Sequence, residues 1–277
     1  MNAELFKKIC PKAFYGKFLE SDIRPDGRDM NDGRGLIVAP GHIGSADGSS
    51  FVRIGMTGII CGLKLEYIDA GEITQTSGNL DVRVIMTPLS NPKFFLGKPT
   101  NQAVFYAETL RRIFEKYVID VGELYVPEMK KMICLHADLL CIDYEGSVMD
   151  ACCIALLAAL MTLKIPTAIL KDDTAVFDYD HPRFLTILDI PVSVTFGFFD
   201  DFEVMDPDVF EEQLVEDTVS VVMGRNARVL SIVKPGGKSI PEKTLEEITT
   251  KVKERYAFVY EQVDAFRNSL STEMNTE

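Results

Sequence analysis

The feature that most constrains the fold is an alternating segment, Lys131–Tyr144, followed at once by a nearly all-apolar segment, Ser147–Leu163. In the first segment apolar residues fall on both faces of a strand-like pattern, which predicts a central strand covered on both sides. The second segment is apolar almost all round, which predicts a buried helix. A chain with this pair is expected to pack layers of helix and strand around a shared core.

The length and composition of the chain allow such a core. It has 277 residues, of which 47% are hydrophobic, enough for one large or two smaller packed units. The longest apolar run, Ala151–Leu163, is shorter than the ~20 residues that a bilayer span needs. Lys7 and Lys8 lie where a secretory signal would be apolar. The sequence therefore predicts a soluble, intracellular protein with no membrane partner.

The charge and the cysteines exclude several classes of site. The chain carries six cysteines without a CxxC pair, and Cys152 and Cys153 lie in the predicted buried helix, where they act as small apolar residues. A structural zinc site needs four convergent ligands, so we expect no metal and no other cofactor.

The net charge of −13 argues against broad RNA binding by the isolated chain. A small basic patch is still compatible with it.

The remaining patterns predict an α+β protein. Helices are expected over Glu4–Glu20, interrupted by Pro11, over the amphipathic Asn101–Val118, and after a Ser239–Glu242 capping box. Strands are expected over Gly35–Ala39, Ser50–Gly55, Gly58–Tyr67, Leu80–Met86, Ala168–Lys171, Phe184–Leu188, Val192–Phe198, Phe202–Met205, Thr218–Met223 and Val229–Val233. We expect two similar halves that share one core and meet near Asp120–Met129.

A series of motifs connects these patterns to a known family. The turn RPDGR at Arg24–Arg28 precedes ADGSSFVRIGMTGIICGLKLE at Ala46–Glu66, and LLCIDYEGSVMDACCIALLAALMTLKIP follows at Leu139–Pro166. The series ends with IPVSVTFGFFDDFEVMDPD at Ile190–Asp208 and VVMGRNARVLSIVKPGG at Val221–Gly237. In this order the motifs resemble the RNase PH family, and in detail the non-catalytic subunits of the eukaryotic RNA exosome ring. Gaps fall only in the loops Ile68–Asn79 and Lys171–Arg183.

This resemblance implies a fold and a setting. The fold would be the RNase PH fold, with two similar α/β halves, a central mixed sheet and buried helices. Residues 1–277 would form one unit, with an N-terminal half over about 12–166 and a C-terminal half over 167–272. The partners implied are the other RNase PH-like ring subunits, caps with S1 and KH domains, a hydrolytic exoribonuclease, and RNA in the assembled channel. The work implied is 3′-to-5′ RNA degradation and processing, including rRNA maturation and mRNA turnover, in the nucleus, nucleolus and cytoplasm.

The resemblance also locates positions of lost chemistry. Phosphorolytic members cleave RNA with inorganic phosphate, which requires fixed positive charge and acid-bound Mg²⁺. They carry one arginine before the buried helix, where this chain has Val148, and another at the opening of the amphipathic helix, where it has Asn101–Val104. Of their two aspartates Asp189 matches the second, and Arg183 stands at the first. The resemblance therefore implies a non-catalytic subunit without catalytic residues.

One loop is a candidate RNA contact, and two other functions stay open. Lys93 and Lys98 flank Phe94–Phe95 in the loop Leu89–Thr100, and basic residues interleaved with aromatics can bind single-stranded RNA; an ordinary exposed loop is the alternative. An active phosphate-dependent 3′-to-5′ exoribonuclease subunit is the second function. A small-molecule kinase is the third, but KPGGK at Lys234–Lys238 lacks the spacing of an ATP loop.

Overall fold

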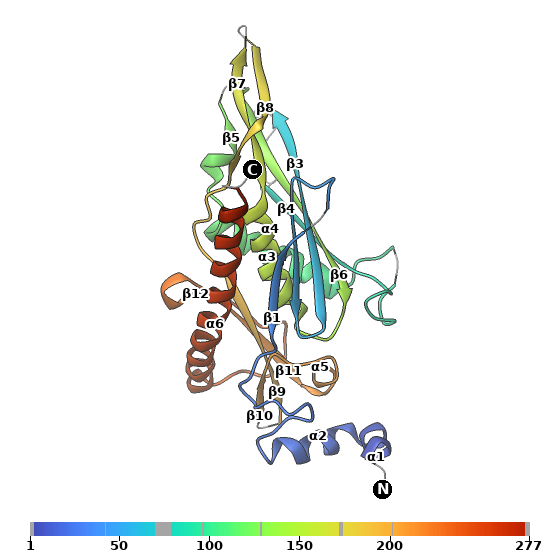
Figure 1. Ribbon diagram of the computed structural model, residues 1–277. Helices are drawn as coiled ribbons and strands as arrows, with labels where there is room; N and C mark the ends of the chain where they lie inside the picture. The colour runs from blue at the N-terminus through green and yellow to red at the C-terminus, as the bar shows by residue number, and fades with distance from the viewer. Residues whose placement is uncertain are drawn as a thin grey trace.

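The computed structural model describes residues 3–41, 43–69, 79–95, 97–127, 129–171, 174–200 and 202–274. It confirms the predicted α+β class, with mixed helices and sheets along an elongated molecule (Figure 1). Two short helices lie at one end, and a two-stranded ribbon projects at the other. Among the described residues, no helix is both long and apolar enough to cross a membrane.

The larger sheet is mixed and has six strands. They are β1 (Leu36–Pro40), β2 (Gly48–Ile54), β3 (Thr57–Asp69), β4 (Leu80–Met86), β5 (Tyr125–Val126) and β6 (Lys131–Asp143). The order is β1-β2-β3-β6-β4, with β5 on β6, and only β4 runs parallel to its neighbour β6. The β2–β3 turn falls at Gly55–Met56, one residue earlier than Met56–Thr57. Gly55 has a φ of +58°, and an added Cβ would lie 2.5 Å from the Arg34 side chain.

The C-terminal sheet has four antiparallel strands in the order β10-β9-β11-β12. These are β9 (Val192–Phe199), β10 (Phe202–Met205), β11 (Asp217–Gly224) and β12 (Arg228–Val233). Between the two sheets in the chain order, β7 (Lys164–Lys171) and β8 (Thr174–Phe184) pair to form the ribbon that projects at the end of the molecule away from the C-terminal sheet.

The predicted strand Phe184–Leu188 is wrong. Strand β8 ends at Phe184, and beyond it only Ile187 makes an isolated bridge, to Ile119. The true strand covers most of Lys171–Arg183, a segment without strong hydrophobic alternation. In a projecting two-stranded ribbon the backbone groups between the strands pair with each other and the outer ones are open to water, so the sequence need not display a buried face.

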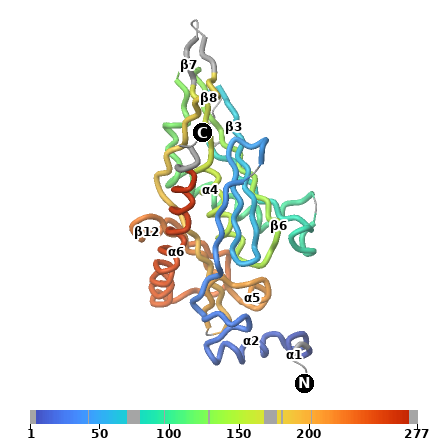
Figure 2. Tube along the Cα trace, in the orientation of Figure 1, coloured from blue at the N-terminus to red at the C-terminus, as the bar shows by residue number. Residues whose placement is uncertain are grey.

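Helix α4 (Val148–Thr162) is a buried helix, as the apolar segment predicts. Every residue from Val148 to Leu160 is buried, and the helix packs against β2 and β3 on one side and β9 on the other. Helix α3 (Asn101–Tyr117) lies against β4. The long helix α6 (Glu242–Met274) runs past β1, β9 and β11 (Figure 2). One apolar core therefore spans both sheets.

The N-terminal segment is built as its sequence predicts. Pro11 separates α1 (Ala3–Ile9) from α2 (Pro11–Leu19), where it takes a first-turn position. Tyr15 and Leu19 bury the second helix, with Leu19 packed beside Phe199 and Val204 of the C-terminal sheet.

The outer face of β6 corrects another expectation. Strand β6 is central, but the described part of the chain leaves the face opposite α4 open at Asp138 and Leu140, which are exposed. Leu140 has Ile60 and Ile85 as its strand partners, so an apolar row crosses this open face. The apolar residues on both faces of β6 therefore did not predict correctly that this chain covers both faces of the strand.

A buried ion pair joins the first and last thirds of the chain. Arg34 binds Asp206 through both carboxylate oxygens, at 2.6 and 3.0 Å, and the Arg34 backbone N–H donates a third hydrogen bond at 2.8 Å. The same guanidinium donates to the carbonyls of Glu145 and Gly146 in the β6–α4 turn. Burial alone would raise the pKa of Asp206, but Arg34 lowers it to about 2.

The RPDGR turn extends this network. Arg24 is 1% exposed and donates to the carbonyls of Met30 and Met205. It also faces Glu211 at 3.6 Å, and Arg28 donates to the carbonyl of Asp206 at 3.2 Å. The motif is thus a turn that buries one arginine and anchors the N-terminal segment to the C-terminal sheet.

Replacing Asp206 with Asn should lower the free energy of unfolding by about 3–5 kcal/mol, because it leaves the buried charge of Arg34 uncompensated. Chemical denaturation monitored by circular dichroism measures the change. Glu108→Gln is the control, since the Glu108–Arg111 pair at 2.9 Å is exposed and should contribute less than about 1 kcal/mol.

The same variant has a pH signature. The folded pKa of Asp206 lies below its ordinary value, so its stabilisation is present above about pH 4 and is lost as the pH falls toward 2. About 2 kcal/mol of acid sensitivity should therefore disappear in Asp206→Asn. Equal acid sensitivity in both proteins would contradict the assignment.

Candidate functional site

A pocket of about 280 Å³ lies in the seam between the two sheets. One wall comes from the loop before α3 and from the first turns of that helix, and the other comes from β9, β11, β12 and the short helix α5 (Glu211–Leu214). Its lining residues are Lys93, Gln102, Phe105, Tyr106, Tyr144, Ser147, Thr195, Glu212, Gln213, Thr218, Ser220, Val233 and Pro235. The pocket therefore brings together the opening of α3 and the turn before α4, the two places where the resemblance puts arginines in active members.

The β6–α4 turn has an unusual backbone. Gly146 has a φ of +86°, and an added Cβ would lie 2.5 Å from the carbonyl oxygen of Pro207. Ser147 follows in the left-handed region, at a φ of 49°. This geometry directs the Ser147 N–H outward at the start of the buried helix, where backbone donors and the helix dipole favour a negative group.

That negative group is part of the chain itself. The Ser147 N–H donates to one oxygen of the Glu212 carboxylate at 2.8 Å, and the Tyr144 hydroxyl donates to the other. Burial and the adjacent Glu212 charge raise the pKa of Tyr144. Each oxygen of the Glu212 carboxylate therefore accepts a hydrogen bond at the place where the turn could otherwise hold an external anion.

A second carboxylate lies beneath the pocket. Asp150, in the first turn of α4, accepts hydrogen bonds from Ser193 Oγ at 2.6 Å, Thr195 Oγ1 at 2.9 Å and Thr195 N–H at 2.8 Å. Ser220 Oγ lies 2.8 Å from Thr195 Oγ1 and extends this network. Burial raises the pKa of Asp150 to about 6, although these donors oppose the shift. Asp150 connects α4 to β9, and it is 4% exposed, so it is not open to the pocket.

The structure does not bring the three sequence-predicted positions together. Val148 is 1% exposed, so its side chain belongs to the core. Arg183, on β8, donates through Nη2 to the carbonyl of Glu123. Asp189 accepts hydrogen bonds from the backbone N–H groups of Ile190 and Arg225, each at 2.7 Å. None of the three lines the pocket in the seam.

The two predicted RNA-contacting lysines differ in their surroundings. The Lys93 ammonium lies 3.8 Å from the centroid of the Tyr144 ring and 5.0 Å from that of Phe94, at the edge of the pocket. Burial lowers the pKa of Lys93, while the Glu212 charge opposes this. Lys98 is exposed farther along the loop and does not line the pocket.

Sequence reasoning missed Arg34, Asp150, Asp206 and Glu212. One signal was readable, because Asp150 is the single charged residue of the segment Ser147–Leu163, and a charge in a buried helix needs partners. Glu212 gave no such signal, since its surroundings in the sequence are polar. Its role depends on a contact between residues 65 positions apart.

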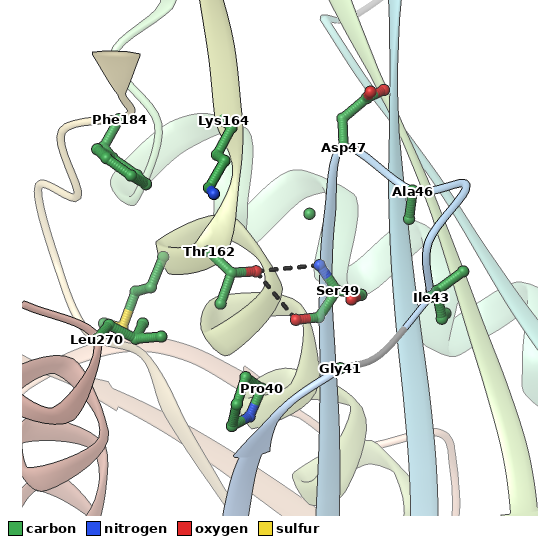
Figure 3. A pocket seen from close by; sticks show the side chains of 12 residues that line it. Pro40, Gly41, Ile43, Ala46, Asp47, Ser49, Thr162, Lys164, Phe184 and Leu270 are labelled. Atoms are coloured by element: carbon green, nitrogen blue, oxygen red, sulfur yellow. Dashed lines mark hydrogen bonds between the residues drawn. The ribbon is translucent and has the colours of Figure 1, made fainter. Parts of the chain in front are cut away.

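A metal centre and a second pocket are the other candidate sites. In the described part of the chain, no group of three or more His, Cys, Asp or Glu residues could hold a metal ion. A pocket of about 330 Å³ lies near the far end of α4 (Figure 3), where Thr162 Oγ1 accepts from the Ser49 N–H and donates to the Ser49 carbonyl. Its lining contains none of the sequence-predicted residues.

Comparison with known proteins agrees with this architecture. Residues 32–166 match the model of the 3′ exoribonuclease family, domain 1, and residues 189–250 match domain 2. The exosome complex component rrp43 of Schizosaccharomyces pombe is 30% identical over 246 residues, covering 85% of this chain and 88% of that protein. The exosome complex component Rrp42 of Methanopyrus kandleri is 30% identical over 225 residues, covering 81% and 84%.

Solved structures show the same fold. A chain of the Archaeoglobus fulgidus exosome with RNA bound to the active site superposes with a TM-score of 0.77 at 25% identity, covering 89% of this chain and 97% of that one. A chain of an archaeal exosome core gives a TM-score of 0.70 at 23% identity. The matched segments hold both sheets, α3, α4 and the seam pocket between them, and the chain belongs to the 3′ exoribonuclease family of RNase PH-like proteins.

Proposed function

We propose that this chain is a non-catalytic subunit of an RNA exosome ring, which supports 3′-to-5′ RNA degradation and processing without cleaving RNA itself. Its relatives are named exosome components, and its structural neighbours are exosome chains, one of them with RNA bound to the active site. The proposed partners are other RNase PH-like ring subunits, S1 and KH caps, a hydrolytic exoribonuclease, and RNA in the channel. The compartments are those of the exosome, namely nucleus, nucleolus and cytoplasm.

The observation that carries the non-catalytic assignment is the Glu212 carboxylate on the Ser147 N–H. Phosphorolysis needs two phosphates held close together by positive charge. Here the turn before α4 holds a negative side chain, and the neighbouring Val148 is apolar and buried. A phosphate at this turn would meet the Glu212 charge instead of a guanidinium.

The residues also do not fit a magnesium site of the kind that active members use. Such a site needs two carboxylates, but one of the two positions is Arg183. The other, Asp189, is engaged with the backbone of Ile190 and Arg225.

The proposal includes an internal division and an RNA contact. The N-terminal half would cover about residues 12–166 and the C-terminal half 167–272, with the seam pocket between them. RNA would contact the loop that carries Lys93 and Lys98. Because the ammonium of Lys93 packs on Tyr144, Lys98 would be the more available of the two.

The isolated chain should release no nucleoside diphosphates from RNA in phosphate and Mg²⁺. Val148→Arg should not restore the reaction, because the side chain at this position belongs to the core and the acid pair would still be incomplete. Thin-layer chromatography of labelled products is the measurement. Phosphate-dependent release that is lost in Asp189→Ala would contradict the proposal.

Co-expression with the RNase PH-like chain next to it in an exosome should give a heterodimer with a raised melting temperature. Stable interfaces of this kind usually bury more than about 2,000 Å², and the apolar row of Ile60, Leu140 and Ile85 is uncovered in the single chain. Size-exclusion chromatography and differential scanning calorimetry report both effects. An RNase PH-like chain from outside any exosome is the control. A stable monomer without affinity for exosome subunits would show the ring assignment to be wrong.

A further inference from the structure

The loop between β4 and α3, described over residues 87–95 and 97–100 and called here the β4–α3 loop, carries two lysines and no carboxylate. The chain carries a net charge of −13, yet no Asp or Glu occurs between Asp81 and Glu108. The cations within that stretch are Arg83, Lys93 and Lys98. A polyanion that approaches this loop therefore meets its cations and no carboxylate of the loop itself.

The loop is held in place by its own turns. Ser90 donates to the Thr87 carbonyl through its N–H at 3.1 Å and through Oγ at 2.8 Å. The Lys93 N–H donates to Asn91 Oδ1 at 3.0 Å, and Thr100 caps α3 by accepting from the Ala103 N–H at 3.1 Å. Side chains on this loop are thus presented on an ordered support, which lowers the entropic cost of binding.

Two adjacent phenylalanines in the loop have opposite environments. Phe94 is 4% exposed and packs edge-to-face on Tyr144, with ring centroids 5.2 Å apart. Phe95 is 77% exposed. The buried Phe94 anchors the loop to the core beside Tyr144, just after β6, whereas the ring of Phe95 faces solvent. Folding of this chain alone therefore gives no reason for an aromatic residue at position 95.

The cations beside these rings are likewise divided. Lys93 packs over Tyr144 and Phe94, next to the anchoring ring. Lys98 is exposed, and among the described residues no carboxylate forms an ion pair with it. An exposed aromatic ring and an unpaired ammonium thus lie on the same short, acid-free loop.

We propose that Phe95 is a stacking platform for one base of single-stranded RNA and that Lys98 contacts the adjoining phosphate. Base–aromatic stacking tolerates any sequence, as a channel that passes many RNAs requires, and a nearby cation adds backbone affinity. The inference rests on the proposed ring function and adds to it the residue that holds the base. A protein surface docking on Phe95 and the exposed Leu89 is the alternative that the experiment must separate.

The experiment uses the reconstituted ring and an oligouridine that carries one 4-thiouridine, crosslinked by ultraviolet light and mapped by mass spectrometry. We expect crosslinks in the peptide of residues 87–100. Phe95→Tyr keeps a ring for stacking and should retain the crosslink yield. Phe95→Leu keeps apolar bulk without a ring, and the yield at the loop should fall about tenfold. Lys98→Gln should reduce the log–log salt slope of RNA binding by about 0.7.

Several results would overturn the inference. The first is an unchanged crosslink yield in Phe95→Leu, and the second is a set of crosslinks that form on the ring but avoid this loop. The third is a loss of subunit assembly in Phe95→Asp with RNA binding intact, which would indicate that Phe95 docks a protein surface. Melting temperatures of the variants verify folding. If no exosome subunit assembles with the chain, the proposed function has failed. The same crosslinking on the full chain alone then decides the role of Phe95 separately.

Discussion

The bidentate ion pair between Arg34 and Asp206 is the interaction on which the rest of the structure depends. It joins the segment before β1 to the segment after β10, and the same guanidinium holds the carbonyls of Glu145 and Gly146. The turn before α4 is therefore fixed from outside as well as by its own backbone. A pair buried this deeply costs desolvation, so its main contribution is to fix one arrangement of the two sheets rather than to add net stability.

The fixed turn before α4 explains why the seam pocket presents a carboxylate and not a phosphate-binding group. In a protein that grips phosphate, the N-terminal end of the central helix would offer backbone donors and positive charge to a ligand. In this chain Glu212 takes the donor, and the buried Val148 supplies no charge. Asp189 and Arg183 hold backbone groups of neighbouring segments. In our proposal, polar groups that could serve chemistry instead hold the two sheets together.

Much of this fold could be predicted from the sequence, and the failures have physical causes. Segments with a clear period, such as Leu80–Met86 and Phe202–Met205, are strands with the predicted bounds. The prediction of Ala168–Lys171 found the second half of β7, but its partner β8 was missed because the pairing of the two strands leaves little hydrophobic pattern. The cover of β6 was overestimated because an alternating pattern does not tell whether the same chain or another chain covers a face. In the site, a resemblance could locate Val148, but the Glu212–Ser147 contact joins residues far apart in the sequence, and no local rule predicts it.

The central claim is that Glu212 already occupies the anion position at the start of α4. A titration of the wild-type chain with inorganic phosphate, followed through the backbone amide signal of Ser147 by nuclear magnetic resonance, tests it most directly. The account predicts no saturable shift of that signal, and a new phosphate-dependent shift only when Glu212 is replaced by Gln. A saturable shift of the Ser147 amide in the wild-type chain would contradict it.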